Sequence, residues 1–373
     1  MELDSAFCAA VARRDPLAAD PVLAALPALN ARADTVALAG ALDGLATAAR
    51  DTRSDRAALP DRLAAVRDLG MLLGSLRRHG VEPLDAVPAA EPVLLRLGRS
   101  TGMAPRDTVL HYGVWNPAGP RRRLFTGAPE EHTLIDSVRT GAPAVERAAL
   151  ELARVLELPP DGAAFADGCE AAARHLAVLP AAVAEVARSV DPAAFFMARL
   201  RPYMEDVRVG GRPWFGPAAA HLPLHLVDRL LWSGDRPDPE HLALQEELLS
   251  FGLPEWTLLH RRQTGRPTVA TLLVRALESA GPRPRPQLRR SAAAVTGLLR
   301  TLLAFRGRHL RLVRAAYTAD AAYGAGSAGA APETVRLVLE LTRQQARQVR
   351  ARAAAAGAPE AALSPPDGPR PSP

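Results

Sequence analysis

One long helical segment, residues 287–318, carries the residue types best suited to chemistry. Seven residues at helical spacing share one face of this predicted helix: Val295, Leu299, Leu302, Arg306, His309, Val313 and Ala316. This face is apolar except for Arg306 and His309, and polar groups on a buried face need partners. A neutral imidazole facing a cavity can bind heme iron, and an arginine one turn earlier can bind a heme propionate. Spacing alone more often reflects a hydrogen-bonded core histidine beside an arginine whose head group reaches water, so both interpretations stay open.

A second candidate is an arginine at a predicted helix break. The segment FFMARLRPY, residues 195–203, contains Pro202, which must end or kink the helix. Arg201 therefore lies where its side chain can reach a pocket and pair with a substrate carboxylate. The alternative is an arginine that binds the free carbonyl groups of a helix C-terminus.

A competing site for a metal lies further along the chain. His221, His225 and Asp228 have the residue types and the i, i+4, i+7 spacing of a non-heme iron site. Pro223 lies between the two histidines and is typical of a helix start, which would leave His221 off the helix. The alternative is that these are polar residues that orient or surround another site.

The loop that follows the long helix is rich in small residues. Residues 324–329 read GAGSAG, but no strand precedes them, so they do not form a dinucleotide-binding fingerprint. Such a loop can close over a flat ligand and offer backbone N–H groups and the Ser327 hydroxyl. A flexible linker has the same composition.

Composition favours an all-α fold and argues against several partners. Arg, Ala and Leu dominate the chain, lysine is absent, and the net charge is +6. The arginines are scattered and only 4% of residues are aromatic, so we expect no nucleic-acid partner. No apolar run reaches the roughly 20 residues of a membrane span, and the two cysteines have no metal-binding spacing. We therefore expect a soluble cytoplasmic protein.

Proline and glycine clusters divide the chain into helical blocks. Apolar periodicity predicts helices over these ranges: 57–79, 143–157, 163–189, 239–253, 267–280 and 287–318. Asp191-Pro192 has the form of a helix N-cap followed by a first-turn proline. Residues 207–211 offer at best a short β-ribbon. The Pro-rich end, residues 357–373, is predicted to be a disordered tail.

Several colinear motifs resemble one known family. They are RDLGMLLGSLRRHGVEPLDAVPAAEPVLLRL (67–97), TVLHYGVWNP (108–117), LRPYMEDVRVGG (200–211) and FRGRHLRLVRAAY (305–317). Together they are similar to the monodechloroaminopyrrolnitrin synthase family, heme proteins related to indoleamine 2,3-dioxygenase. The resemblance runs from about residue 15 to residue 352.

The resemblance implies roles for individual residues. His309 matches the proximal iron ligand, and Arg306 and Asp228 match a charged pair near a heme propionate. Phe196 and Arg201 match substrate-pocket residues on the distal side, with the arginine facing the substrate carboxylate. Three further matches are Gly216 at the heme edge and, in the small-residue loop near the substrate, Ser327 and Gly329. No catalytic acid or base is implied.

The resemblance also implies an organisation. We expect a smaller N-terminal helical part, residues 1–117, covering the distal side of the pocket. Residues 118–356 would form the larger helical domain of indoleamine 2,3-dioxygenase-like type, which holds the heme. The chain departs from the dioxygenase pattern at Pro105, Arg147, Pro217 and Ala330. These departures bear more on the substrate than on heme attachment.

The function implied is oxidation of an indole amino acid by heme b, with dioxygen as co-substrate. The named family activity rearranges 7-chlorotryptophan to a phenylpyrrole with decarboxylation, whereas the dioxygenases cleave the indole C2–C3 bond. An external electron donor is a possible partner. Two other functions stay open: a heme-binding sensor or carrier without turnover, and a helical scaffold that binds partner proteins through its arginine-rich faces.

Overall fold

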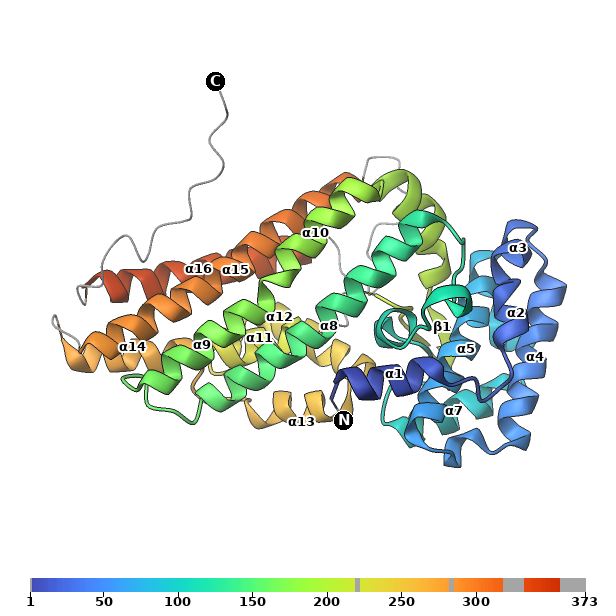
Figure 1. The fold of residues 1–373 in the computed structure, drawn as a ribbon, viewed down its shortest axis with the longest axis horizontal. Helices are drawn as coiled ribbons and strands as arrows, with labels where there is room; N and C mark the ends of the chain where they lie inside the picture. Colours follow the sequence, from blue (N-terminus) through green and yellow to red (C-terminus); the bar gives the residue numbers. More distant parts are fainter. Residues whose placement is uncertain (1, 219–221, 282–284, 318–331, 356–373) are drawn as a thin grey trace, which may run out of the picture.

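The computed structural model describes residues 2–218, 222–281, 285–317 and 332–355 of the chain. In this part the protein is almost entirely helical, which confirms the predicted all-α class. Its helices form an elongated bundle, with the N-terminal helices gathered at one end of the molecule (Figure 1). No helix within these ranges is both long and apolar enough to cross a membrane.

The N-terminal end is built from short helices around one central helix, α5. The helices are α1 (Ser5–Arg13), α2 (Asp20–Ala24), α3 (Leu26–Ala31), α4 (Thr35–Asp51), α5 (Leu59–Arg78), α6 (Pro83–Ala86) and α7 (Ala90–Thr101). Every residue of α5 from Leu63 to Leu76 is buried, because α1, α4 and α7 pack around it. Single turns η1 (Ser54–Arg56) and η3 (Gly119–Arg121) and the π-helical η2 (Leu110–Val114) complete this end.

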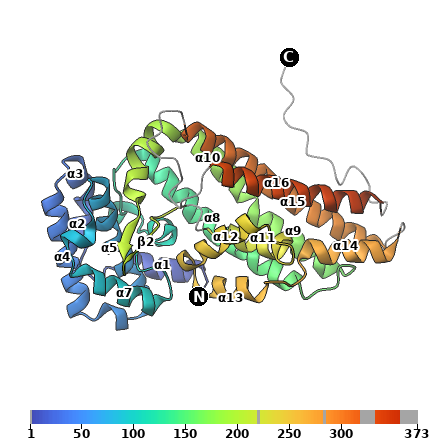
Figure 2. The ribbon, with the colours of Figure 1, turned by 180° about the vertical axis from the view of Figure 1, so that it is seen from behind.

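Long antiparallel helices form the rest of the bundle. They are α8 (Pro129–Val155), α9 (Ala163–Leu176), α10 (Val178–Ser189), α14 (Val269–Ala280), α15 (Pro286–Ala316) and α16 (Pro332–Ala355). Shorter helices α11 (Leu224–Asp228), α12 (Pro239–Leu248) and α13 (Pro254–Arg262), with η7 (Arg229–Ser233) and η8 (Leu249–Phe251), lie along one side of the bundle (Figure 2). Helix α15 packs against α9, α10, α14 and α16, so it lies at the centre of this arrangement.

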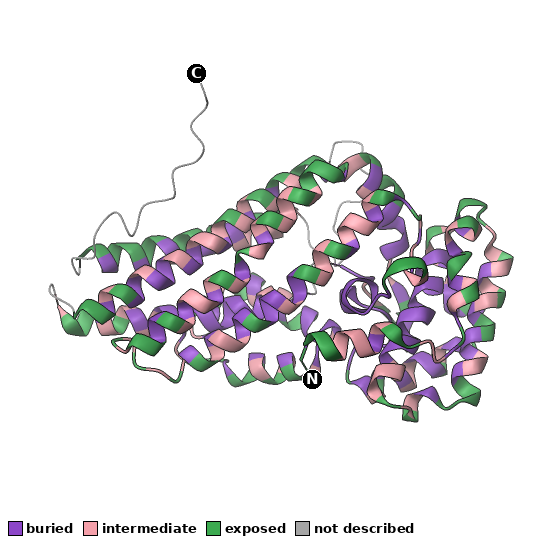
Figure 3. Ribbon diagram, in the orientation of Figure 1, coloured by how far each residue is buried: buried purple, intermediate pink, exposed green. Residues whose placement is uncertain are grey.

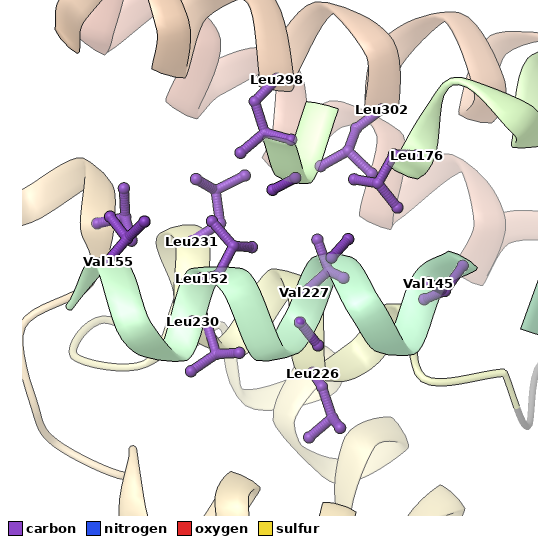
Figure 4. Close-up of a cluster of buried hydrophobic side chains, with 14 of the residues drawn as sticks. Val145, Leu152, Val155, Leu176, Leu226, Val227, Leu230, Leu231, Leu298 and Leu302 are labelled. Atoms are coloured by element: carbon purple, nitrogen blue, oxygen red, sulfur yellow. The ribbon is translucent and has the colours of Figure 1, made fainter. Parts of the chain in front are cut away.

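In the described residues the core consists of two large hydrophobic clusters, which both contain residues of α5 and α8, and a small third cluster around Ala218 and Leu248. Leu152 of α8, Leu231 of η7 and Leu302 of α15 meet in the larger cluster and have no exposed surface (Figure 4). Fully burying a leucine side chain stabilises the fold by roughly 1.5–3 kcal/mol. Ile135 of α8 belongs to the smaller, N-terminal cluster, which also includes residues from η4 (Pro192–Leu200) and η5 (Arg201–Met204). The predicted division at residue 117 stays a prediction.

The strands found in the described ranges are β1 (Val207–Val209) and β2 (Arg212–Trp214), where the sequence indicated a short ribbon. They pair antiparallel, with Val207 opposite Trp214. Gly210 and Gly211 connect them with φ angles of 64° and 76°. A two-residue hairpin turn of this kind needs positive φ at both positions, which glycine adopts without strain.

Two of the predicted helices are wrong in their extent. Helix α8 begins at Pro129 rather than at residue 143 and continues through Pro143. The prediction used proline as a boundary, but the buried residues on either side of Pro143, such as Ala142 and Val145, hold that stretch helical. The predicted helix 163–189 is divided into α9 and α10 at Ala177.

Candidate functional site

The histidine on the long helix has the properties of a ligand. His309 lies on α15, is half-buried, and stacks on Phe305 with ring centroids 5.7 Å apart and planes 6° apart. Within the described residues, neither ring nitrogen forms a hydrogen bond. Burial, and then the charge of Arg306, lower the pKa of His309 to about 4. The imidazole is therefore neutral at pH 7, with a nitrogen lone pair able to bind a metal.

Arg306 forms a buried ion pair with Asp228, as the resemblance implied. Its Nη2 atom lies 2.6 Å from both carboxylate oxygens, and its Nη1 atom donates to the hydroxyl of Thr342 on α16. Both side chains of the pair are at most 6% exposed. The pair therefore joins α11, α15 and α16 one turn from His309. A role beside a heme propionate stays a prediction.

Asp228 is held by residues other than Arg306. Trp232 donates its indole N–H to Asp228 at 2.9 Å, and His241 Nε2 lies 3.5 Å from the other oxygen. Burial raises the pKa of a carboxyl group, but the charge of Arg306 and the hydrogen bonds from His241 and Arg306 outweigh it and lower the pKa of Asp228. Asp228 is therefore ionised and fixed in orientation.

Beyond Asp228 lies a polar cluster that the sequence did not indicate. His241 stacks on Trp232 at 5.1 Å, and Gln245 lies 3.3 Å from His241 and 3.3 Å from His260. Burial lowers the pKa of His260 to about 3, so this ring is also neutral. The i, i+4 spacing of His241 and Gln245 on α12 was a weak signal, because the cluster forms only when α11 and α13 pack against α12.

The competing non-heme iron site receives little support. His221 lies outside the described residues, and Asp228 faces Arg306 rather than an open position. In the described ranges, no three His, Cys, Asp or Glu side chains lie close enough to hold a metal ion. His225 is buried, and burial lowers its pKa to about 4.

Arg201 lies at the predicted helix break. The π-helical η4 begins after Asp191, which accepts hydrogen bonds from the N–H groups of Ala193 and Ala194, and ends at Leu200. The next turn, η5, begins at Arg201. Arg201 is 7% exposed, donates to the carbonyl of Met204 at 3.3 Å, and lies 3.8 Å from Glu205. These findings confirm the predicted break, whereas a role for Arg201 in binding a substrate carboxylate stays a prediction.

Gly216 lies against the same backbone as Arg201. A Cβ atom at residue 216 would come within 2.5 Å of the Met204 carbonyl oxygen, so only glycine fits there. The structure therefore brings together Gly216 and Arg201, which both touch Met204. Phe196 lies on η4, half-buried, and η4 packs against α15. Ser327 and Gly329 lie outside the described residues.

Tyr317 is a residue that the sequence analysis missed. It follows α15 directly, two turns beyond His309, and its hydroxyl is buried without a hydrogen-bond partner among the described residues. Burial raises the pKa of Tyr317, and the nearby charge of Arg201 partly offsets that rise. Arg201 therefore lies near the C-terminal end of the helix that carries His309. Its position as the last residue of the FRGRHLRLVRAAY motif (305–317) was the available signal.

Fold and site together define an all-helical protein whose central helix carries a histidine and, one turn away, an arginine paired with a buried carboxylate of α11. A family profile described as monodechloroaminopyrrolnitrin synthase PrnB matches residues 29–355, which include all of these residues. The chain belongs to this family, as the motifs indicated. It is a family of enzymes that carry out oxidative chemistry, and the protein is accordingly an oxygenase-like enzyme.

Proposed function

We propose that this protein is a heme b-dependent enzyme that oxidises or rearranges tryptophan or a halotryptophan-like indole in pyrrolnitrin-type antibiotic biosynthesis, with His309 as iron ligand. The observation that carries the proposal is the neutral, unbonded imidazole of His309, one turn from the buried Arg306. The ring is half-buried, and a partly buried polar ring without a partner is costly, a cost that a bound ligand removes.

The residues present fit a heme. His309 would bind the iron, and Arg306, oriented by Asp228, would bind a propionate through its charge. Gly216 would lie at the heme edge, as the family resemblance implies, and its lack of a side chain lets its backbone pack against Met204, beside Arg201. When bound, the heme supplies the electron chemistry and the site for dioxygen, the expected co-substrate.

The chain itself would bind and orient the substrate. The guanidinium of Arg201 is buried, so its charge-assisted hydrogen bonds to a substrate carboxylate would be strong. Phe196 would cover the indole, and the Tyr317 hydroxyl could donate a hydrogen bond to a polar substrate group. The family resemblance implies a substrate-binding role for Ser327 and Gly329 as well, which lie outside the described residues. No protein base is assigned.

Absorption spectroscopy of the purified protein tests the proposal. Protein made with sufficient heme should show a Soret band, and His309→Ala should lose most of it. The control is His79→Ala, which removes a half-buried histidine at the end of α5, in the N-terminal part. A colourless wild type, or a His309→Ala variant with the wild-type spectrum, would contradict the proposal. Iron bound without porphyrin would instead favour a site that includes His225 and Asp228.

A further inference from the structure

The helix that carries His309 has an unusual charge composition. Helix α15 contains no aspartate or glutamate, and its arginines are Arg289, Arg290, Arg300, Arg306, Arg308, Arg311 and Arg314. Three of them, Arg308, Arg311 and Arg314, are exposed and lie in the last third of the helix, around His309. We call these three residues the α15 arginine face.

The two ends of α15 differ in how these charges are neutralised. Near the first end, Arg290 pairs with Asp167 at 2.5 Å and with Glu170 at 2.9 Å. No ion pair to the α15 arginine face occurs in the described part of the chain. The one bond of Arg308 that the structure defines goes to the carbonyl of Pro180, at 2.7 Å.

The acidic residues of the neighbouring helices do not neutralise the α15 arginine face, because they are matched by other arginines. On α10, Glu185 is paired with Arg188, and on α16, Glu340 is paired with Arg343. Glu333 of α16 is exposed, and so is Arg336 one turn further on, so the two charges of that turn offset each other. Figure 3 shows exposed and half-buried residues along the outer side of α15 and α16. The α15 arginine face is therefore a solvated cationic surface.

The α15 arginine face lies across the helix from His309. At about 100° per residue, Arg311 is rotated by roughly 200° from His309, so the two side chains leave opposite sides of the helix. An α-helix is about 10 Å across. A protein that docks on Arg311 would therefore lie about one helix diameter from the proposed iron ligand.

We propose that the α15 arginine face docks an acidic one-electron carrier protein, with an iron–sulfur cluster or a flavin, which reduces the heme iron. This inference rests on the proposed function for the presence of heme. One electron passes from the carrier, which is oxidised, to ferric iron, which becomes ferrous, and no bond is made or broken. Electron-transfer complexes are small and are steered by complementary charge, which matches three exposed arginines on one surface. A nucleic acid is less favoured, because no Phe, Tyr or Trp lies between these arginines for base stacking.

Binding titrations with an acidic plant-type [2Fe–2S] ferredoxin test the proposal. At low salt, Arg311→Glu should weaken binding roughly tenfold, because it replaces an attractive charge by a repulsive one. Arg308→Glu and Arg314→Glu should weaken binding in the same direction. The matched control is Arg99→Glu on α7, an exposed arginine of the N-terminal part, which should leave binding unchanged. Equal loss in the control, or no loss in Arg311→Glu, would overturn the proposal.

Two further measurements separate this proposal from its alternatives. In heme-loaded protein, the rate of iron reduction by the ferredoxin should fall in Arg311→Glu, while the Soret band of the oxidised protein stays the same. Tighter binding of duplex DNA than of ferredoxin, with the same sensitivity to Arg311→Glu, would overturn it. If the chain binds no heme, the proposed function fails. The ferredoxin titration can still be carried out on the heme-free chain, and it then tests whether the α15 arginine face binds the carrier.

Discussion

Two regions of this protein bury arginine in different ways. In the N-terminal part, Arg67 of α5 donates two hydrogen bonds to Asp68, at 2.8 and 2.9 Å, and others to the carbonyls of Val11, Arg14 and Trp115. All three nitrogens of its guanidinium are bonded within the protein. Such a group crosslinks segments far apart in sequence and has no donor left for a ligand.

In the region around α15, the polar groups are not all hydrogen-bonded. Arg306 is bonded to Asp228 and Thr342, while His309 one turn away has no hydrogen bond within the described residues, and the Tyr317 hydroxyl has none either. Both regions are buried and charged, so burial alone does not distinguish structure from function. The difference lies in the arginines and their nearest neighbours: all five N–H groups of Arg67 are bonded within the protein, whereas Arg306 lies one turn from the unbonded ring of His309.

The largest expected effect is on stability, at the fully bonded arginine. Arg67→Leu removes five hydrogen bonds and leaves Asp68 buried with fewer partners, so the free energy of unfolding should fall by about 3–5 kcal/mol. Urea denaturation of the heme-free protein measures this. Arg50→Leu, which removes an exposed arginine of α4, should change stability by less than about 0.5 kcal/mol. A loss below about 1 kcal/mol in Arg67→Leu would remove the distinction drawn between the two regions.

Asp228 should couple stability to heme retention. Asp228→Asn removes the charge that orients Arg306, and loss of a buried ion pair costs about 3 kcal/mol or more. Heme retention should fall in Asp228→Asn and fall further in Arg306→Ala, and the two effects should not add in the double variant. The control is Glu278→Ala, since Glu278 and Arg352 form an exposed pair that contributes less than about 1 kcal/mol. Additive effects would show that the pair does not act as a unit.

Arg201 should affect the substrate and leave the heme unchanged. A desolvated charge-assisted bond contributes roughly 1.5–3 kcal/mol, so Arg201→Ala should weaken tryptophan binding about 10- to 100-fold. Tryptamine, which lacks the carboxylate, should bind the wild type and the variant equally. The control is Arg199→Ala, an exposed arginine of η4 that lies over Phe195. Optical titration of the heme-loaded protein gives both affinities, and equal losses for the two ligands would assign Arg201 another role.

Taken per pH unit, the smallest effect expected is a decline of stability as the pH falls. Burial, and then the charge of Arg67, lower the pKa of His111 to about 3, and its Nδ1 accepts a hydrogen bond from the Thr108 N–H at 3.1 Å. The unfolded chain therefore binds a proton below pH 6.5 that the folded protein does not bind above pH 3. His111 lowers stability by about 1.4 kcal/mol per pH unit as the pH falls through that window. His111→Asn should make the decline less steep in urea titrations between pH 6.5 and 4, and an unchanged slope would assign the dependence to other histidines.

Much of this fold could be predicted from local signals. Composition indicated an all-helical protein, periodicity placed Arg306 and His309 on the inner face of one helix, and Asp191 marked a helix start. The path of α8 through Pro143 could not be predicted, because tertiary contacts on both sides overcome the local preference of proline. The same holds for the cluster of His241, Gln245 and His260, since helices far apart in sequence create it.

The sharing of α5 and α8 between the two large hydrophobic clusters has a consequence for how the protein unfolds. Leu63 of α5 and Val145 of α8 belong to the larger cluster, while Leu72 and Ile135 of the same helices belong to the smaller one. Neither cluster can come apart without fraying a helix that supports the other. Heating should therefore give one cooperative calorimetric transition rather than two, and slow amide exchange should extend across both ends of the molecule.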